Sequence, residues 1–435
     1  MATTEPFGSR TGDHDPIRVM VVDDSAVVRG LETRMLEADP AIKVVASVGN
    51  GQMALSALDR NDIEVVILDI EMPVMDGLTA LPKILAKDPS VKVIMASTLT
   101  LKNAEVSLQA LNLGASDYLT KPSSSRELTS GGDFTRELPE KVKALGQAAR
   151  RTRSRTGPRS AASPKPGGRV PFSRPGTSAA SPASAPGDST LSRTAALRGG
   201  AAKPAPSSHP SPAPTARAAA GSHGSSAGHA TSGFALAKPS RDKPAIIAIG
   251  SSTGGPQALF KVLGDMKAAG WVKQPVIITQ HMPATFTTIL AGHIGRITGG
   301  VSKEGEDGEV LVGGNVYVAP GDHHMVVETK GTETRLRINQ DPPENFCRPA
   351  VDPMFRSVSS SFGRRSLAVV LTGMGSDGAK GGKIIADGGG TLIAQDEPTS
   401  VVWGMPGAAA HTGACSAVLP LEDIGSYILR LANKT

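Results

Sequence analysis

The sequence predicts two α/β domains, each with a mainly parallel sheet, joined by a long disordered linker. The chain has 435 residues, more than one core usually holds. Residues 150 to 243 consist mostly of Ala, Pro, Ser, Gly and Thr, with too few apolar side chains to offset the entropy of ordering. On both sides of this segment, short apolar runs alternate with amphipathic stretches. We therefore expect domains at 17–149 and 244–435.

The first domain shows five apolar runs separated by helical patterns. We expect strands near 17–22, 43–47, 65–68, 91–96 and 117–120, and helices near 26–38, 51–60, 77–87, 102–112 and 136–149. This β-then-α alternation predicts a doubly wound parallel sheet, whose functional groups gather beyond the carboxyl ends of the strands.

Polar residues stand at those strand ends. Asp23 and Asp24 follow the first strand, and Asp69 ends the third. Three converging carboxylates repel one another unless a hard cation such as Mg²⁺ neutralises them. Asp69 is then a candidate nucleophile toward a phosphoryl group, while Ser97 and Lys121, after the fourth and fifth strands, are candidates to bind its oxygens. Each residue alone is better explained as a helix cap or a turn, by about three to one, so the prediction depends on the combination.

Three segments of this domain resemble the receiver domain of bacterial response regulators. They are Val21 to Ser25, Leu68 to Gly77 and Thr120 to Pro122. The resemblance covers Ile17 to about Ala149. It implies that Asp69 is phosphorylated by a sensor histidine kinase with Mg²⁺ as cofactor, and that Tyr118 is an aromatic switch residue.

The second domain opens with an apolar strand that runs into the turn Gly250-Ser-Ser-Thr-Gly254. A sharp turn of this kind between strand and helix pushes its middle serine, Ser252, out above the sheet, near backbone N–H groups that can stabilise an oxyanion. The glycine spacing of a dinucleotide site and the Lys-Ser/Thr ending of a phosphate-binding loop are both missing. Taken alone, the motif fits a nucleophile and a structural turn about equally.

Two later strand ends supply partners for a nucleophilic serine. His281 follows the apolar run at 276–280, and Asp377 lies in the loop after the run at 367–372. A base and a carboxylate that orients it are what such a serine requires. The chain order Ser, His, Asp differs from that of the α/β-hydrolases, so that fold is not implied.

Other residues compete for these roles. His323 and His324 lie in a predicted turn between strands, and Asp352 and Asp396 could orient a base, although Asp352 resembles a helix cap. Cys347 is a weak rival nucleophile, because no histidine follows it in a comparable strand-end motif.

The segment from about Pro244 to the C-terminus resembles the catalytic domain of the chemotaxis methylesterase family, CheB. The resemblance rests on residues 249–255, 278–283, 317–322, 348–352 and 371–378. It implies a Ser252 nucleophile, a His281 base and acid, an Asp377 orienter, and backbone oxyanion donors near Thr253 and Met374. It also implies the substrates, which are γ-glutamyl methyl esters and certain glutamines of chemoreceptors, a catalytic domain without cofactor, and a receiver that covers the active site until it is phosphorylated.

Charge and composition weigh against two other outputs. The net charge is +6, but residues 150 to 243 carry 15 Lys/Arg and 2 Asp/Glu, a net of +13, which leaves −7 for the rest. An acidic remainder without a basic recognition helix argues against nucleic-acid binding. A general small-ester hydrolase would need an apolar pocket, for which 3% aromatic residues offer little lining.

Cysteine content and hydropathy indicate the compartment. Only Cys347 and Cys415 are present, too few for a disulfide framework or a cysteine zinc site. No apolar run approaches the roughly 20 residues of a membrane span, and the first 15 residues lack a signal-peptide core. We therefore expect a cytoplasmic protein with no direct membrane insertion.

Overall fold

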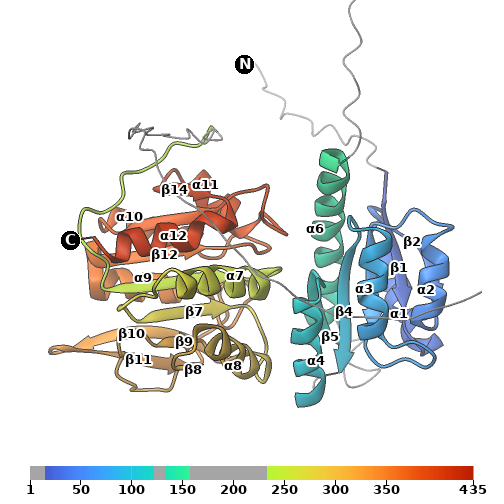
Figure 1. Cartoon of the computed structure of the whole chain (residues 1–435), viewed down its shortest axis with the longest axis horizontal. Coiled ribbons are helices and arrows are strands. Elements are labelled where there is room, and N and C mark those ends of the chain that lie inside the picture. Colours follow the sequence, from blue (N-terminus) through green and yellow to red (C-terminus); the bar gives the residue numbers. More distant parts are fainter. Residues whose placement is uncertain (1–14, 99, 122–132, 157–232, 435) are drawn as a thin grey trace, which may run out of the picture. The chain divides into compact units, whose positions relative to one another are not determined.

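A computed structural model describes residues 15–98, 100–121, 133–156 and 233–434 of the chain. Most of the predicted linker therefore lies outside the described residues, as does Pro122 of the receiver-like motif. Both α/β domains are present (Figure 1). No helix in the described ranges is long and apolar enough to cross a bilayer.

The N-terminal domain alternates strands and helices as the sequence predicts. Its elements are β1 (Ile17–Val22), α1 (Ala26–Glu37), β2 (Ile42–Val48), α2 (Gly51–Leu58), β3 (Val65–Asp69), α3 (Gly77–Lys87), β4 (Lys92–Thr98), α4 (Leu101–Asn112), β5 (Asp117–Lys121) and α6 (Asp133–Thr156). Within the described residues the strands form one parallel sheet in the order β2-β1-β3-β4-β5. The central strand β3 is buried along its whole length, because helices cover both faces of a doubly wound sheet.

The C-terminal domain is built on a second, longer parallel sheet. Its elements are β6 (Ile246–Ser251), α7 (Gly255–Ala268), β7 (Val276–Gln280), α8 (Phe286–Thr298), β8 (Ser302–Glu304), β9 (Val316–Val318), β10 (His324–Lys330), β11 (Glu333–Asn339), α9 (Val351–Phe362), η1 (Gly363–Arg365), β12 (Ser366–Val370), α10 (Ala379–Asp387), β13 (Thr391–Gln395), α11 (Met405–His411), β14 (Ala417–Leu419) and α12 (Leu421–Ala432). The sheet order is β14-β13-β12-β6-β7-β9-β8, and β10 and β11 form a separate antiparallel hairpin. The central strands β12, β6 and β7 thus end side by side at one edge.

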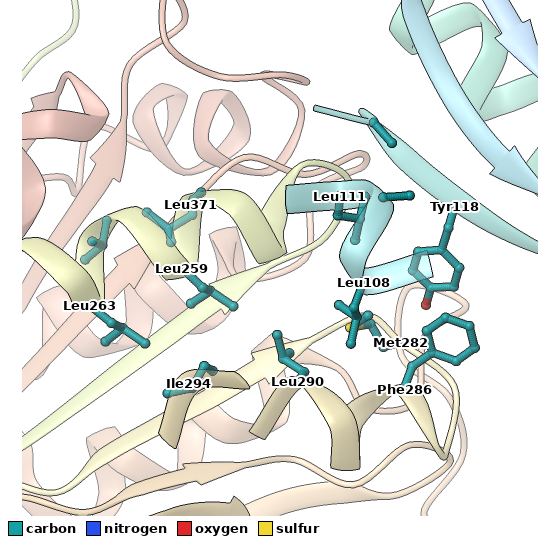
Figure 2. Packing of buried hydrophobic residues seen from close by; sticks show 14 of the residues in the cluster. Leu108, Leu111, Tyr118, Leu259, Leu263, Met282, Phe286, Leu290, Ile294 and Leu371 are labelled. Atoms are coloured by element: carbon teal, nitrogen blue, oxygen red, sulfur yellow. The ribbon is translucent and has the colours of Figure 1, made fainter. Parts of the chain in front are cut away.

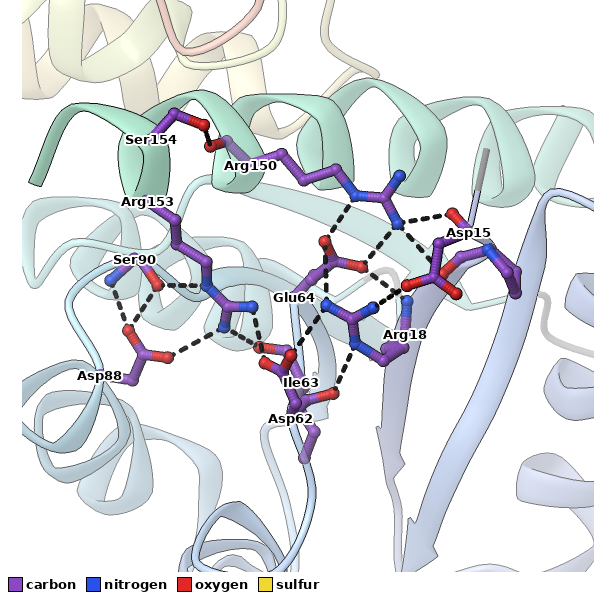
Figure 3. A network of polar contacts seen from close by, with 11 residues as sticks. Asp15, Arg18, Asp62, Ile63, Glu64, Asp88, Ser90, Arg150, Arg153 and Ser154 are labelled. Atoms are coloured by element: carbon purple, nitrogen blue, oxygen red, sulfur yellow. Dashed lines mark hydrogen bonds and ion pairs between the residues drawn. The ribbon is translucent and has the colours of Figure 1, made fainter. Parts of the chain in front are cut away.

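Helix α6 is longer than the sequence predicts. It runs to Thr156, so assigning 150–156 to the linker is wrong. Arg150 binds the buried Glu64 at 2.6 Å, and Arg153 binds Asp62 at 2.7 Å and Asp88 at 3.0 Å (Figure 3). The two arginines are three residues apart and share one helix face, where these acidic partners of the receiver hold them.

The other end of the predicted linker also belongs to a folded domain. Ala237 donates its amide to the Cys415 carbonyl at 2.9 Å, and Ser240 donates its amide to the Thr391 hydroxyl at 2.9 Å. The described part of residues 233–243 therefore packs on the catalytic domain, which begins earlier than 244.

An apolar cluster joins the two α/β domains within one compact unit. Helix α4 packs against α7 and α8. Leu108 and Tyr118 belong to the same buried cluster as Met282 and Phe286 (Figure 2). The Tyr118 ring stacks on Phe286, with ring centroids 4.4 Å apart and an interplanar angle of 11°.

Candidate active site and phosphoacceptor pocket

The ends of β1, β3 and β5 bring the predicted acidic residues and the lysine together. Carboxylate oxygens of Asp23, Asp24 and Asp69 lie within 4.8 Å of one another. The Lys121 Nζ lies 2.5 Å from Asp23 Oδ2 and 2.7 Å from Asp69 Oδ1. Burial raises the pKa of Asp69 above its usual value, although Lys121 opposes the shift. One lysine leaves this cluster short of positive charge, and its all-oxygen donor set suits a hard divalent cation.

Ser97, expected to bind the phosphoryl group and to change position with phosphorylation, and Tyr118, the expected aromatic switch residue, both make contacts away from Asp69. Ser97 is buried, and its Oγ lies 3.2 Å from Ser107 Oγ on α4. Tyr118 is 5% exposed and packs on Phe286 as described above. Ser97 thus contacts the receiver helix that meets the catalytic domain, and Tyr118 contacts that domain directly.

The sequence reasoning missed Glu32, on α1. Its side chain is fully buried, and both of its carboxylate oxygens lack a hydrogen-bond partner within the described structure. It lines a cavity of about 200 Å³ together with Asp23, Asp69 and Lys121. Burial raises the pKa of Glu32 to about 8. The spacing from Glu32 to the buried Leu36 is i,i+4, which was a readable signal that Glu32 faces inward.

The serine turn has the geometry of an elbow. β6 ends at Ser251 and α7 begins at Gly255. Gly254 has a φ of +75°, and a Cβ at this position would lie 2.6 Å from Val401, so glycine is required. The Ser252 amide donates to the Thr372 carbonyl at 3.0 Å, which ties the elbow to the loop after β12.

His281 and Asp377 form the predicted base and carboxylate pair. His281 follows β7, and its amide donates to the Ser251 carbonyl at 3.1 Å, directly beside the elbow. The His281 Nε2 lies 2.8 Å from Asp377 Oδ2. The histidine is thus oriented by the carboxylate through Nε2, which leaves Nδ1 to face the reacting groups.

Asp377 is held by the start of α9. Its carboxylate accepts the amides of Val351 at 2.6 Å and Asp352 at 2.9 Å, and the Asn345 side-chain amide at 3.0 Å. Burial alone would raise the pKa of Asp377, but the bonds from His281 and these amides lower it below its usual value. The carboxylate therefore stays ionised, as an orienting group must.

The structure places Cys347 beside the histidine, which the sequence reasoning did not anticipate. The Cys347 Sγ lies 3.4 Å from His281 Nδ1. Within the described residues no hydrogen bond joins the Ser252 hydroxyl to His281. Burial acts to lower the pKa of His281, but the Cys347 sulfur and Asp377 together raise it to about 10. These contacts favour the protonated form of the imidazole.

The other competing residues have structural partners. Asp352 accepts the amides of Gly378 at 3.0 Å and Gly381 at 2.7 Å, so it caps α10 rather than its own helix. His324 accepts the Ala350 amide at 3.1 Å through Nδ1. Two further contacts serve turns: His323 Nδ1 lies 3.1 Å from the Gly321 carbonyl, and Asp396 accepts the Thr399 amide at 3.0 Å.

The two expected oxyanion donors flank the elbow. Thr253 follows Ser252 directly, and Met374 follows Gly373, where a Cβ would lie 2.9 Å from the Ser252 Cβ. In the described part of the chain, neither the Thr253 amide nor the Met374 amide has a hydrogen-bond acceptor. Neither amide is therefore committed to another acceptor in the described residues.

A polar contact links the receiver to the same elbow. The Thr253 hydroxyl donates to Asp117 Oδ2 at 2.8 Å, and Lys141 Nζ lies 3.1 Å from the same oxygen. Thr253, Asp117 and the side chain of Lys141 are largely withdrawn from solvent. The start of β5 thus contacts the turn that carries Ser252.

Fold and site together define a response regulator with an esterase-like output domain. Residues 19–131 match the model of the response regulator receiver domain, and residues 247–428 match that of the CheB methylesterase. A protein-glutamate methylesterase/protein-glutamine glutaminase from Rhodospirillum rubrum is 61% identical over 96% of this chain and 96% of its own length. The corresponding protein from Paramagnetospirillum magneticum is 57% identical over 96% of this chain and 97% of its own length.

The chain belongs to the protein-glutamate methylesterase/protein-glutamine glutaminase family. Among solved structures, the Thermotoga maritima CheB methylesterase catalytic domain is 36% identical, with a TM-score of 0.42, and the match covers 44% of this chain and 100% of that one.

Proposed function

We propose that this protein hydrolyses γ-glutamyl methyl esters of chemoreceptors and deamidates certain receptor glutamines, and that phosphorylation of its receiver activates it. The names of its relatives support this function, as does the presence of both domains in one chain. The observation that carries it is the His281–Asp377 pair at 2.8 Å, at the sheet edge that presents the Ser252 elbow.

In the proposed reaction, Ser252 attacks the ester carbonyl while His281 Nδ1 accepts its proton. The amides of Thr253 and Met374 stabilise the oxyanion. The returned proton leaves with methanol, and water then hydrolyses the acyl-enzyme by the same route. For a glutamine substrate, ammonia replaces methanol as the leaving group.

The described arrangement suits a resting enzyme. A general base must be neutral, whereas contact with Cys347 and Asp377 raises the pKa of His281 to about 10. The imidazole must therefore exchange its Cys347 contact for Ser252 before catalysis. The bond between Thr253 and Asp117 supports a role for the unphosphorylated receiver in holding the elbow.

Activation follows from the acidic pocket of the receiver. We propose that Asp23, Asp24 and Asp69 would hold Mg²⁺, which would supply positive charge at the site where Asp69 takes a phosphoryl group from a sensor histidine kinase. Lys121 then pairs with the phosphoryl oxygens, and the Ser97 and Tyr118 contacts rearrange. We propose that these steps occur in the cytoplasm, where the modified receptor helices lie.

The test compares the serine with its thiol rival. Methanol release from methylated receptor should fall by about 10⁶ in kcat for Ser252→Ala, because the residues of a triad act as a unit. Cys347→Ser should retain most of the activity. Loss of activity in the cysteine variant, with substantial activity kept in the serine variant, would make Cys347 the nucleophile and refute the serine mechanism.

A further inference from the structure

We infer that Phe346 is a specificity-determining residue that docks the substrate helix beside the catalytic histidine. This inference rests on the proposed function. Its basis is a tight turn, residues 344–347, whose flanking residues contact the catalytic pair and whose aromatic ring points into solvent.

The backbone of the turn is closed on both sides. The Glu344 amide donates to the Cys347 carbonyl at 3.1 Å, and the Cys347 amide donates to the Glu344 carbonyl at 2.9 Å. Both central residues have positive φ, 52° at Asn345 and 63° at Phe346. Positive φ at both central positions is typical of a type I′ turn, which favours Asn first and Gly second.

Phenylalanine therefore adopts a strained backbone conformation at position 346. A bulky side chain with positive φ is a genuine outlier, and such strain persists where the surroundings fix it. Burial of the ring does not offset this strain, because Phe346 is 80% exposed.

The surroundings of the turn fix Phe346 next to the reacting groups. Asn345 donates to Asp377 at 3.0 Å and to Asp352 at 3.2 Å. On the other side, the Cys347 sulfur contacts His281 Nδ1 at 3.4 Å. The backbone of Phe346 is thus held between one residue that bonds the catalytic carboxylate and another that contacts the catalytic histidine.

The occupant we infer is a helical segment of the polypeptide that carries the esterified glutamate. Residues three or four positions from that glutamate lie on the same helix face, so an apolar side chain there can pack on the ring while the ester enters the site. A rigid aromatic ring loses little conformational entropy in such a contact. In the described state Arg136 of α6 lies over the same ring, 4.8 Å from its centroid, so the receiver contacts the surface that the substrate would use.

The test uses two substrates with the full-length, phosphodonor-activated protein. The first is a methylated receptor fragment, and the second is a γ-methyl ester of a blocked single glutamate, which cannot reach the ring. The variant is Phe346→Asn, because asparagine tolerates positive φ and preserves the turn. Phe346→Tyr keeps the ring, and Val312→Asn, at a residue 53% exposed, is the control for losing an exposed apolar side chain elsewhere.

We expect Phe346→Asn to raise KM for the receptor fragment about tenfold, with kcat little changed, because the lost contact is made equally in the ground and transition states. Its kcat/KM for the small ester should stay within about twofold of wild type. Phe346→Tyr and Val312→Asn should both keep the wild-type KM for the receptor fragment.

Two results would overturn the inference. Equal loss on both substrates would mean that Phe346 acts only through the shape of the catalytic site, and no loss on either would mean that the ring is not used. If the wild-type protein released methanol from neither substrate, the proposed function would itself be wrong and the inference would fall with it.

Discussion

The contact between Thr253 and Asp117 should control how tightly the unphosphorylated receiver holds the catalytic domain. Thr253→Val removes one hydroxyl, but keeps the side-chain shape and the backbone amide. The hydroxyl is buried at 2.8 Å from a carboxylate oxygen, and a hydrogen bond to a charged group contributes about 1.5–3 kcal/mol. Because Lys141 remains 3.1 Å from the same oxygen, the lower end of that range applies.

A loss of about 1.5 kcal/mol corresponds to about tenfold in the docking equilibrium. We expect the unphosphorylated activity of Thr253→Val to rise by about this factor, up to the level of the activated enzyme. The assay is methanol release from methylated receptor by the full-length protein, with and without a small phosphodonor and Mg²⁺. The ratio of the two rates corrects for any direct effect of valine on the elbow.

Thr298→Val is a matched control for this experiment. Thr298 is also buried, but its hydroxyl donates to the Ile294 carbonyl within its own helix at 3.0 Å. This variant should keep the wild-type ratio. An unchanged ratio in Thr253→Val would refute the view that this contact restrains the enzyme.

Three further predictions concern the receiver. Asp69→Asn should abolish activation by a phosphodonor while sparing basal activity, and chelation of Mg²⁺ should do the same to the wild type. Activation that survives either treatment in the same methanol-release assay would contradict the proposal that the acidic pocket accepts the phosphoryl group with Mg²⁺. Burial raises the pKa of Glu32 from 4.5 to about 8, so the native state binds a proton that the unfolded state releases. Wild type should therefore lose stability relative to Glu32→Gln as pH rises, by up to about 4 kcal/mol between pH 4.5 and 7.5, and parallel melting curves across that interval would exclude this. Arg153→Ala removes the contacts to Asp62 and Asp88 and should speed amide hydrogen exchange in the last two turns of α6, measured by mass spectrometry. Unchanged exchange would show that these ion pairs do not stabilise the end of the helix.

The strand ends of both domains could be predicted from the sequence because parallel sheets bring them to one edge. Asp69 ends β3, and His281 follows β7, where apolar runs in the sequence stop. The loop residue Asp377 could be placed near them because it follows another apolar run, which the structure shows to be the strand adjacent to β6.

The contacts of loop 344–347 were beyond this reasoning. Cys347 contacts His281 although the two residues are 66 positions apart in the sequence. It lies beside a turn with positive φ values, and such a turn has no apolar periodicity from which the contact could be predicted. The end of α6 could not be predicted from the sequence for another reason. Arg150 and Arg153 lie in a stretch whose composition resembles the linker, and acidic partners far away in the chain stabilise the helix there.

The Asp377 carboxylate binds the start of α9, and this limits what a substitution of Asp377 can reveal about catalysis. One carboxylate oxygen accepts from His281 and the Val351 amide, and the other accepts from the Asp352 amide and Asn345. An asparagine offers one oxygen and one NH₂ group, so in either orientation it would point a donor at another donor. Asp377→Asn would therefore shift α9 and the catalytic loop together, and its lost activity would measure the architecture of the helix start as much as the chemistry of the histidine.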